Sequence, residues 1–341
     1  MVHAINQQAA KAALAHQAQL TKPQGALGRL EDLACWFAAR QGKTIPDALR
    51  PRIAVFAADH GVVAEGVSAF PSVVTGEMVK NFAAGGAAIN VLARQCEAQL
   101  VIVDVGVAVD CSNIAGVIHR RVQAGTANIC HEPAMSKQAC LQAMKAGREQ
   151  AQQAHADACN LLIAGDMGIG NTTASAAIIC ALTGLSPETV VGNGTGVDEE
   201  GRKRKVQAVK RAITRAGDAT DDVLWQLGGL EIAAICGCYL EAAKLGIPVV
   251  VDGFIATAAA LVAQQQQAKV VDWMLASHIS QEQGHLAALQ TLGLTPLIDF
   301  SLRLGEGSGA ALVVPLLQSA IALHRDMASF EAAGVSGKGD E

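Results

Sequence analysis

Aromatic and charged side chains are scarce in this chain of 341 residues, and aliphatic side chains abound. Aromatic residues make up 3% and charged residues 17%, against 51% hydrophobic residues. Aliphatic packing must therefore form the core, and so apolar a composition is typical of α/β proteins whose sheet is covered on both faces. The net charge of −5 and the lack of basic segments interleaved with aromatic residues argue against nucleic-acid binding.

The chain also lacks long apolar runs and regularly spaced cysteines. No segment reaches the roughly 20 uninterrupted apolar residues of a membrane span, because glutamines follow the run at 255–263. The N-terminal segment MVHAINQQAAKAALAHQ has the pattern of a polar amphipathic helix rather than of a signal peptide. The nine cysteines show no zinc or disulfide spacing beyond a lone Cys236–Cys238 pair. We therefore expect a cytoplasmic protein whose cysteines are small apolar core residues.

Short apolar runs alternate with longer helical patterns along most of the chain. The predicted strands are 52–59, 99–106, 160–166 and 247–253, with a weaker fifth at 270–278. The clearest predicted helices are 137–156, 171–183, 199–216 and 230–244. This order predicts a parallel sheet with helices on both faces. Small, acidic or histidine residues end several of these strands, at the edge where α/β sheets bind ligands.

The two ends of the chain stand outside this alternation. Residues 1–45 are predicted to form two helices separated at 22–25, and a last helix is predicted at 310–327. We expect 1–45 and 305–330 to pack together as a small helical subdomain beside an α/β domain of residues 46–304. Residues 331–341 have the composition of a flexible tail.

Two glycine-rich segments are candidates for phosphate binding. In GDMGIGNTT (165–173) the glycines allow close approach to a ligand, and Asn171, Thr172 or Thr173 is predicted to cap the following helix. The spacing is not the dinucleotide fingerprint, and a tight turn that only packs strand against helix explains it equally well. In 192–205, glycines precede a predicted cap at Asp198 and the basic run 203–205. A glycine loop with a nearby cation suits a phosphate monoester, whereas a solvated basic helix face is the alternative.

Isolated acidic and histidine residues leave more than one interpretation open. Asp59-His60 ends a predicted strand before a Gly- and Ser-rich loop, and the pair fits acid–base work, a metal or a structural hydrogen bond. Because no second His or Cys lies at ligand spacing, a metal is disfavoured. The segment ASHISQEQGH (276–285) is equally ambiguous. In LRLGEGSGAAL (302–312), Glu306 is either a poorly solvated proton acceptor or an acid near the start of the last helix.

Taken together, these segments resemble the nicotinate-nucleotide–dimethylbenzimidazole phosphoribosyltransferases of cobalamin biosynthesis. The matching motifs span nearly the whole chain in order: KPQGALGRLE (22–31), AADHGV (57–62), GVSAFPS (66–72), GDMGIGNTT (165–173), GTGVDEEG (194–201), GGLEIAAICG (228–237), VVVDGFIATAAALVA (249–263) and LRLGEGSGAAL (302–312). The resemblance implies a homodimer with a Rossmann-like parallel sheet and a small helical subdomain from both chain ends. It implies no cofactor and no metal.

The resemblance also implies a reaction and its residues. Ribose 5-phosphate moves from nicotinate mononucleotide to 5,6-dimethylbenzimidazole with inversion, giving nicotinate and α-ribazole 5′-phosphate, and Glu306 stands at the family's general-base position. The positions that match the family's phosphate- and nucleotide-binding loops are Gly168, Gly170, Gly194 and Lys205. Asp252 and Ser280 match positions near the ribose and the nicotinate, and Ser72 matches the benzimidazole side. Asp166 matches a position that is often Glu in relatives. The loop 277–285 departs from the family's SHRSAEPGH, with Ile279 for Arg and Gln283 for Pro.

Two other functions compete with this interpretation. A dinucleotide-dependent dehydrogenase is disfavoured by the glycine spacing and by the lack of an acidic residue ending a second strand at the expected offset. A non-catalytic nucleotide-binding or scaffold protein remains an alternative. It predicts that removing the carboxylate of Glu306 leaves function untouched.

Overall fold

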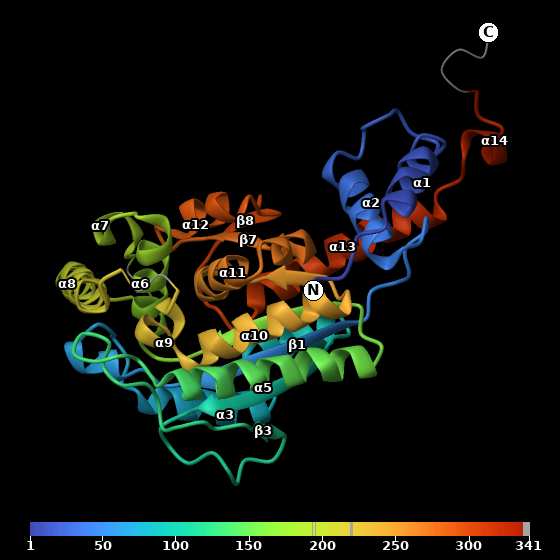
Figure 1. Cartoon of the computed structure of the whole chain (residues 1–341). Helices are drawn as coiled ribbons and strands as arrows, with labels where there is room; N and C mark the ends of the chain where they lie inside the picture. The colour runs from blue at the N-terminus through green and yellow to red at the C-terminus, as the bar shows by residue number, and fades with distance from the viewer. Residues whose placement is uncertain (193, 195, 219–220, 337–341) are drawn as a thin grey trace.

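The computed structural model describes residues 1–192, 194, 196–218 and 221–336, and a parallel sheet lies at its centre. Among these residues, six strands pair in the order β3-β2-β1-β4-β5-β6 (Figure 1). They are β1 (Pro51–Ala58), β2 (Gln99–Gly106), β3 (Val117–His119), β4 (Leu161–Met167), β5 (Val249–Val251) and β6 (Met274–Ala276). All five pairings are parallel. The predicted α/β class is confirmed, and the strand order is that of Rossmann-type sheets.

Helices cover both faces of this sheet, which explains the apolar strand sequences. Ala54 and Phe56 of β1 face one hydrophobic cluster, which includes α5 (Lys137–Ala156) and α10 (Leu230–Leu245). Ile53 and Val55 face the other, which includes α3 (Val73–Ala83), α4 (Ala88–Gln95) and α13 (Ser308–Asp326). Because successive side chains of a strand point to opposite faces, every residue of β1 is buried.

The predicted helices agree closely with the structure. Helices α5, α6 (Asn171–Thr183) and α8 (Glu199–Ala216) have the predicted bounds, and α10 ends one residue later than predicted. The remaining helices are α1 (Gln7–Gln17), α2 (Arg29–Gln41), α7 (Pro187–Val190), α9 (Val223–Leu227), α11 (Phe254–Gln266), α12 (His285–Leu292) and α14 (Phe330–Ala333), with 3-10 helices η1 (Gly61–Glu65) and η2 (Ala268–Trp273). In the described part of the chain, none of the helices combines the length and apolarity needed to cross a membrane.

Two local predictions were wrong. The weak strand at 270–278 begins as η2, and only 274–276 join the sheet as β6. The expected loop after Asp59-His60 contains η1 and the start of α3. Sequence patterns also missed β3 and a separate two-stranded sheet of β7 (His278–Ser280) and β8 (Ile298–Leu302), because short, partly polar strands carry little periodic signal.

The two chain ends pack against each other, as Figure 1 shows for α1, α2 and the end of α13. The buried ring of His324 joins them: its Nδ1 accepts from Gln17 Nε2 at 2.7 Å, and its Nε2 donates to Thr44 O at 2.9 Å. Helix α13 also packs on the sheet, so the proposed division at residues 46 and 304 stays a prediction.

The first residues of the predicted tail at 331–341 belong to a short helix, and the flexibility of the tail stays a prediction. Residues 330–333 form α14 because Ser329 caps this turn and Phe330 N donates to Gln19 O at 2.9 Å. Residues 337–341 of that predicted tail lie outside the described residues.

Candidate active site

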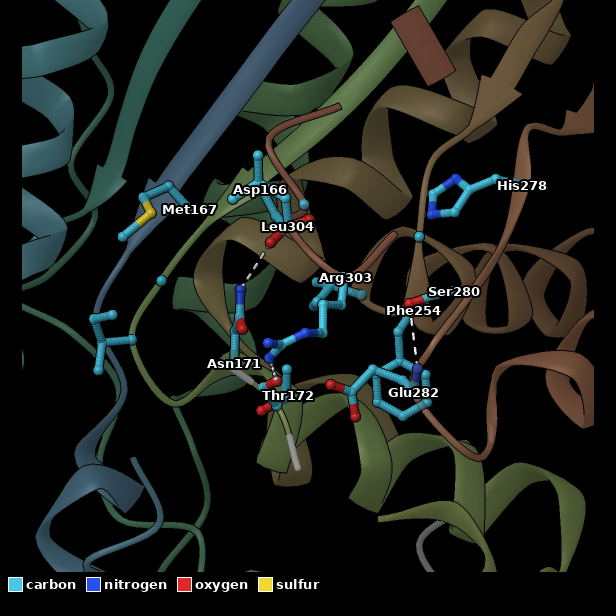
Figure 2. Close-up of a pocket in the computed structure, with 16 residues that line it drawn as sticks. Asp166, Met167, Asn171, Thr172, Phe254, His278, Ser280, Glu282, Arg303 and Leu304 are labelled. Atoms are coloured by element: carbon cyan, nitrogen blue, oxygen red, sulfur yellow. Dashed lines mark hydrogen bonds between the residues drawn. The ribbon is translucent and has the colours of Figure 1, made fainter. Parts of the chain in front are cut away.

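Two adjoining cavities lie at the carboxyl edge of the sheet, near the ends of β1 and β4. The strand order changes direction between these two strands, which is the usual ligand site of such sheets. The first cavity is bordered by loops after β4, β5 and β8 and by β7 (Figure 2). The second lies between the loop after β4, residues 67–68 and α8. The residues shared by both are Gly168, Ile169, Asn171, Thr172 and Gly194.

The structure brings most of the predicted site residues to these cavities. Those lining the first are Asp166, Gly168, Gly194 and Ser280. Those lining the second are Gly168, Gly170, Gly194 and Lys205. Ser72, Asp252 and Glu306 line neither cavity. Their positions are described separately below.

The loop from Gly168 to Gly170 needs glycine for steric reasons. A Cβ on Gly168 would lie 2.4 Å from Ala58 O, and Gly170 has a φ of +93°. Gly170 occupies the N-cap of α6, so the predicted capping by Asn171, Thr172 or Thr173 was wrong. The side chain of Asn171 instead donates to Asp166 Oδ2 at 2.9 Å.

Lys205 is the basic residue of α8 that reaches the second cavity. Its Nζ donates to Thr172 Oγ1 at 3.0 Å and to Gly192 O at 3.3 Å. Burial lowers the pKa of this amine, and the charge of Glu282 opposes that effect. Lys203 pairs with Glu200, and Arg204 Nε donates to Gly66 O.

Asp198 caps α8, as predicted, by accepting from Gly201 N at 2.7 Å. The cap fixes the start of the helix whose second turn carries Lys205. The glycine loop and the buried amine therefore form a cradle suited to an anion.

Asp166 is a buried carboxyl group facing the first cavity. Burial raises its pKa well above the usual value, and the negative charges of Asp252, Glu231 and Glu306 add to this effect. The hydrogen bond from Asn171 opposes the shift. The surroundings therefore favour the protonated form of this carboxyl group.

Asp252 holds the loop that carries Glu306. Its carboxylate accepts from Gly307 N at 3.1 Å and from Ala310 N at 2.9 Å. These donors belong to the first turn of α13 and the glycine before it. Asp252 therefore fixes where α13 begins, while its predicted place near ribose or nicotinate stays a prediction.

Glu306 is buried, at 5% exposure, in a left-handed backbone conformation with a φ of +65°. Its backbone touches β4 so closely that a Cβ on Gly165 would lie 2.3 Å from Glu306 O. Its Oε2 accepts from Ile89 N at 3.3 Å. Burial is the main cause that raises its pKa, and the bond from Ile89 opposes it.

Glu306 does lie directly before the N-cap of α13, as the alternative interpretation expects, but its one described hydrogen bond comes from another helix. The carboxylate accepts from the first turn of α4, whereas Gly307 N and Ala310 N, at the start of α13, donate to Asp252. A buried, weakly solvated carboxyl group with one backbone donor is suited to accept a proton.

Ser72 lies half-buried at the start of α3, where its side chain makes no capping hydrogen bond. Helix α3 is tied to the glycine loop because Ile169 N donates to Thr75 Oγ1 at 3.2 Å. Ser72 therefore borders the same edge of the sheet, but its predicted contact with benzimidazole stays a prediction.

Asp59 and His60 each have a hydrogen-bonding partner in the structure. His60 Nε2 and Glu231 Oε1 lie 2.6 Å apart and both side chains are buried. Asp59 Oδ2 accepts from Ala108 N at 2.7 Å. Among the described residues, no group of three His, Cys, Asp or Glu side chains is placed to hold a metal ion.

Sequence reasoning missed several residues that line the first cavity. These are chiefly Phe254, His278, Glu282 and Arg303. Two of them fall in the segment 276–285, which sequence patterns had marked without assigning a role. Arg303 belongs to the same motif as Glu306, but the motif was interpreted only through the carboxylate of Glu306.

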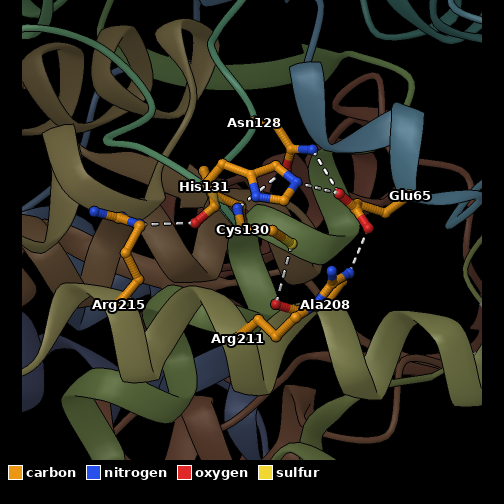
Figure 3. A network of polar contacts seen from close by, with 8 residues as sticks. Glu65, Asn128, Cys130, His131, Ala208, Arg211 and Arg215 are labelled. Atoms are coloured by element: carbon orange, nitrogen blue, oxygen red, sulfur yellow. Dashed lines mark hydrogen bonds and ion pairs between the residues drawn. The ribbon is translucent and has the colours of Figure 1, made fainter.

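A polar network joins the loop before α3 to α8 (Figure 3). Glu65 accepts from Asn128 Nδ2 at 2.7 Å, from His131 Nε2 at 3.0 Å and from the guanidinium of Arg211. Hydrogen bonds from these donors, that from Arg211 first, lower the pKa of Glu65. The network fixes two walls of the second cavity relative to each other, because residues 67–68 and Lys205 lie on the segments that it joins.

Comparison with known proteins agrees with this geometry. A family model described as "Phosphoribosyltransferase" matches residues 2–335. A curated nicotinate-nucleotide–dimethylbenzimidazole phosphoribosyltransferase of Chromobacterium violaceum is 59% identical over 333 residues, covering 97% of this chain and 96% of that protein. The chain belongs to this phosphoribosyltransferase family.

Other members show the same likeness. The Pseudomonas fluorescens relative of that name is 52% identical over 337 residues, covering 98% of this chain and 96% of the relative. The crystal structure of the Thermus thermophilus phosphoribosyltransferase matches with a TM-score of 0.93 and 47% identity, covering 98% of this chain and all of that one. The assignment to this phosphoribosyltransferase family excludes both the dehydrogenase and the scaffold interpretation.

Proposed function

We propose that this phosphoribosyltransferase moves the 5-phosphoribosyl group of nicotinate mononucleotide to 5,6-dimethylbenzimidazole, with Glu306 as general base. The products are nicotinate and α-ribazole 5′-phosphate, so the reaction serves the assembly of the cobalamin nucleotide loop. The observation that carries the proposal is the burial of Glu306 beside two cavities that suit a nucleotide.

The two cavities supply complementary parts of a nucleotide site. The glycine loop, Gly194 and Lys205 surround the second cavity, which suits the 5′-phosphate. The first cavity has Asp166 and Ser280 for ribose and pyridine contacts. The acceptor base then enters on the side of α3 and α4, where the carboxyl group of Glu306 lies.

The proposed proton transfer follows from the chemistry of the acceptor. One benzimidazole nitrogen forms a bond to the anomeric carbon, and the bond from that carbon to the pyridinium nitrogen breaks. The electron pair of the broken bond neutralises the pyridinium, so the leaving nicotinate needs no proton at nitrogen. Positive charge grows on the benzimidazole ring, and Glu306 takes the proton from its other nitrogen. Attack opposite the leaving group inverts the anomeric carbon.

We also propose a cytoplasmic homodimer. The nine cysteines are free and buried, which is typical of proteins in a reducing compartment. Exposed apolar side chains at Phe70 and Val73 surround the start of α3, and Val109 contacts Gly76 of that helix. A second copy of the chain would cover these side chains.

The Glu306→Gln variant tests the proposed base. We expect its turnover to fall by about 10²- to 10⁴-fold, the usual contribution of a positioned base, while nicotinate mononucleotide still binds, because the substituted carboxyl group lines neither cavity. Purified protein is incubated with both substrates and the products are identified by mass. Calorimetric titration with nicotinate mononucleotide measures binding.

The exposed Glu331 of α14 provides the matched control, and Glu331→Gln should behave as wild type. Wild-type turnover in Glu306→Gln would show that this carboxyl group is not the base. Failure of the wild-type protein to form α-ribazole 5′-phosphate would refute the proposed reaction itself.

A further inference from the structure

Arg303 extends across the first cavity. It lies between β8 and α13, and its Nη1 donates to Gly194 O at 3.1 Å on the facing loop. Figure 2 shows its side chain reaching toward Asn171 and Thr172, with the carboxylate of Glu282 directed into the same space. The guanidinium therefore faces the interior of the cavity from a loop adjacent to Glu306.

The charge of Arg303 has no partner at ion-pair distance. Among the described residues, no carboxylate oxygen lies within 4.0 Å of its nitrogens. Its one described hydrogen bond goes to a neutral carbonyl, although a guanidinium has five N–H donors in a planar fork that matches a carboxylate. Arg303 is therefore available to pair with an anionic group of a bound ligand.

The two cavities each contain one strongly basic side chain, Arg303 in the first and Lys205 in the second. The remaining basic group, His278, has a pKa lowered mainly by burial, which favours its neutral form. Nicotinate mononucleotide has two anionic groups, a phosphate and a pyridine carboxylate. If Lys205 and the glycine loop hold the phosphate, the carboxylate falls to the cavity of Arg303, where Phe254 and Ile255 provide apolar surface for the ring.

We propose that Arg303 pairs with the carboxylate of the pyridine leaving group and sets the preference for nicotinate over nicotinamide mononucleotide. This inference rests on the proposed function. A carboxylate accepts two parallel hydrogen bonds from a guanidinium. An amide offers one acceptor, has no charge, and turns its own N–H donors toward the donors of Arg303.

The test compares kcat/KM for the two nucleotides in the wild type, Arg303→Met and Arg303→Lys. We expect Arg303→Met to lose about 10- to 100-fold with nicotinate mononucleotide, the usual range for a hydrogen bond to a charged group, and far less with nicotinamide mononucleotide. Arg303→Lys keeps the charge without the planar fork and should recover part of the preference. Lys205→Met should weaken both nucleotides alike, because they share the phosphate.

Arg325→Met at the far end of α13 is the matched control, since Arg325 is exposed and pairs only with the neighbouring Asp326 in the described structure. Thermal melting confirms that each variant folds. Equal losses with both nucleotides in Arg303→Met would overturn the proposal. If the wild type catalyses no transfer, the proposed function fails, and titration with free nicotinate and nicotinamide still decides the role of Arg303. If Arg303→Met binds nicotinate as tightly as the wild type does, or if the wild type binds nicotinate no more tightly than nicotinamide, the proposed role of Arg303 is rejected.

Discussion

At the scale of single residues, the buried side chain of His285 positions part of the lining of the first cavity through hydrogen bonds. Its Nδ1 accepts from Ser280 N at 2.8 Å, and its Nε2 donates to Thr257 Oγ1 at 2.9 Å. The bond from Ser280 N requires the neutral ring, because Nδ1 can accept only without a proton, and burial lowers the pKa of His285 to about 3. Ser280 lines the first cavity, so a buried neutral histidine positions the backbone there.

This histidine predicts how stability depends on pH. Between pH 6.5 and 3 the unfolded chain binds a proton at His285 that the folded chain does not bind, so the stabilisation is complete above pH 6.5 and declines as pH falls. From pH 7.5 to pH 5 the loss from this group is about 2 kcal/mol. Urea unfolding at both pH values should show a smaller loss in His285→Gln than in the wild type. Equal losses in both proteins would contradict the prediction.

At the scale of elements, η1 and α8 are joined through Glu65, and each contributes to the second cavity through its neighbours. Arg211 of α8 pairs with Glu65, and Arg204 of the same helix donates to Gly66 O at 3.0 Å. The side chain of Glu65 is only 15% exposed. Its negative charge therefore acts between segments that are far apart in the sequence.

The Glu65→Gln variant should raise KM for nicotinate mononucleotide by roughly 3- to 10-fold, the net effect of one ordinary hydrogen bond, because Glu65 acts on the cavity only through the segments that it joins, and should change kcat less. The glutamine amide loses the charge that faces Arg211 and turns donors toward other donors. Steady-state kinetics measure KM and kcat separately, and Glu65→Asp, which keeps the charge, should return KM part of the way to the wild-type value. Glu149→Gln, which breaks the half-exposed pair with Arg120, serves as the control. A lower melting temperature with unchanged KM would reduce Glu65 to a structural role.

The helices and strands themselves were largely predictable from sequence. Residues 137–156, 171–183 and 199–216 carry clear helical patterns, and their bounds match α5, α6 and α8. The capping of α6 was not predictable, because Asn171 and Thr172 are good caps whose side chains bond instead to Asp166 and Lys205. The local sequence allows these side chains either to cap α6 or to bond to distant residues, and the tertiary contacts favour the second role.

At the scale of the whole molecule, the alternating pattern predicted the covered parallel sheet, and the motifs predicted the family. The pairing of distant groups was out of reach. Nothing near Glu306 in the sequence indicates that its carboxylate meets Ile89, more than two hundred residues away. His60 likewise pairs with Glu231 rather than with its neighbour Asp59. Such contacts depend on how the loops at the sheet edge pack, which periodicity does not describe.

The proposed dimer gives a prediction at this scale. Light scattering should report twice the chain mass of 35.1 kDa. Phe70, at 46% exposure beside α3, is a test position, and Phe70→Glu should shift the mass toward one chain because it places a charge in the proposed interface. Leu141, at 53% exposure on α5 across the sheet, is the control, and Leu141→Glu should leave the mass unchanged. A single-chain mass for the wild type would rule out the dimer.

The direct backbone contact between Gly165 and Glu306 limits how evolution can tune this enzyme. No side chain separates the two segments, so substitution at Gly165 can only displace Glu306, the proposed base, and cannot adjust its position by degrees. Helices α3 and α4 instead pack through ordinary side chains, and Ile89 of α4 donates to the carboxylate of Glu306. Substitutions that adjust the surroundings of Glu306 should therefore be better tolerated on those two helices than at the strand end and its adjoining turn.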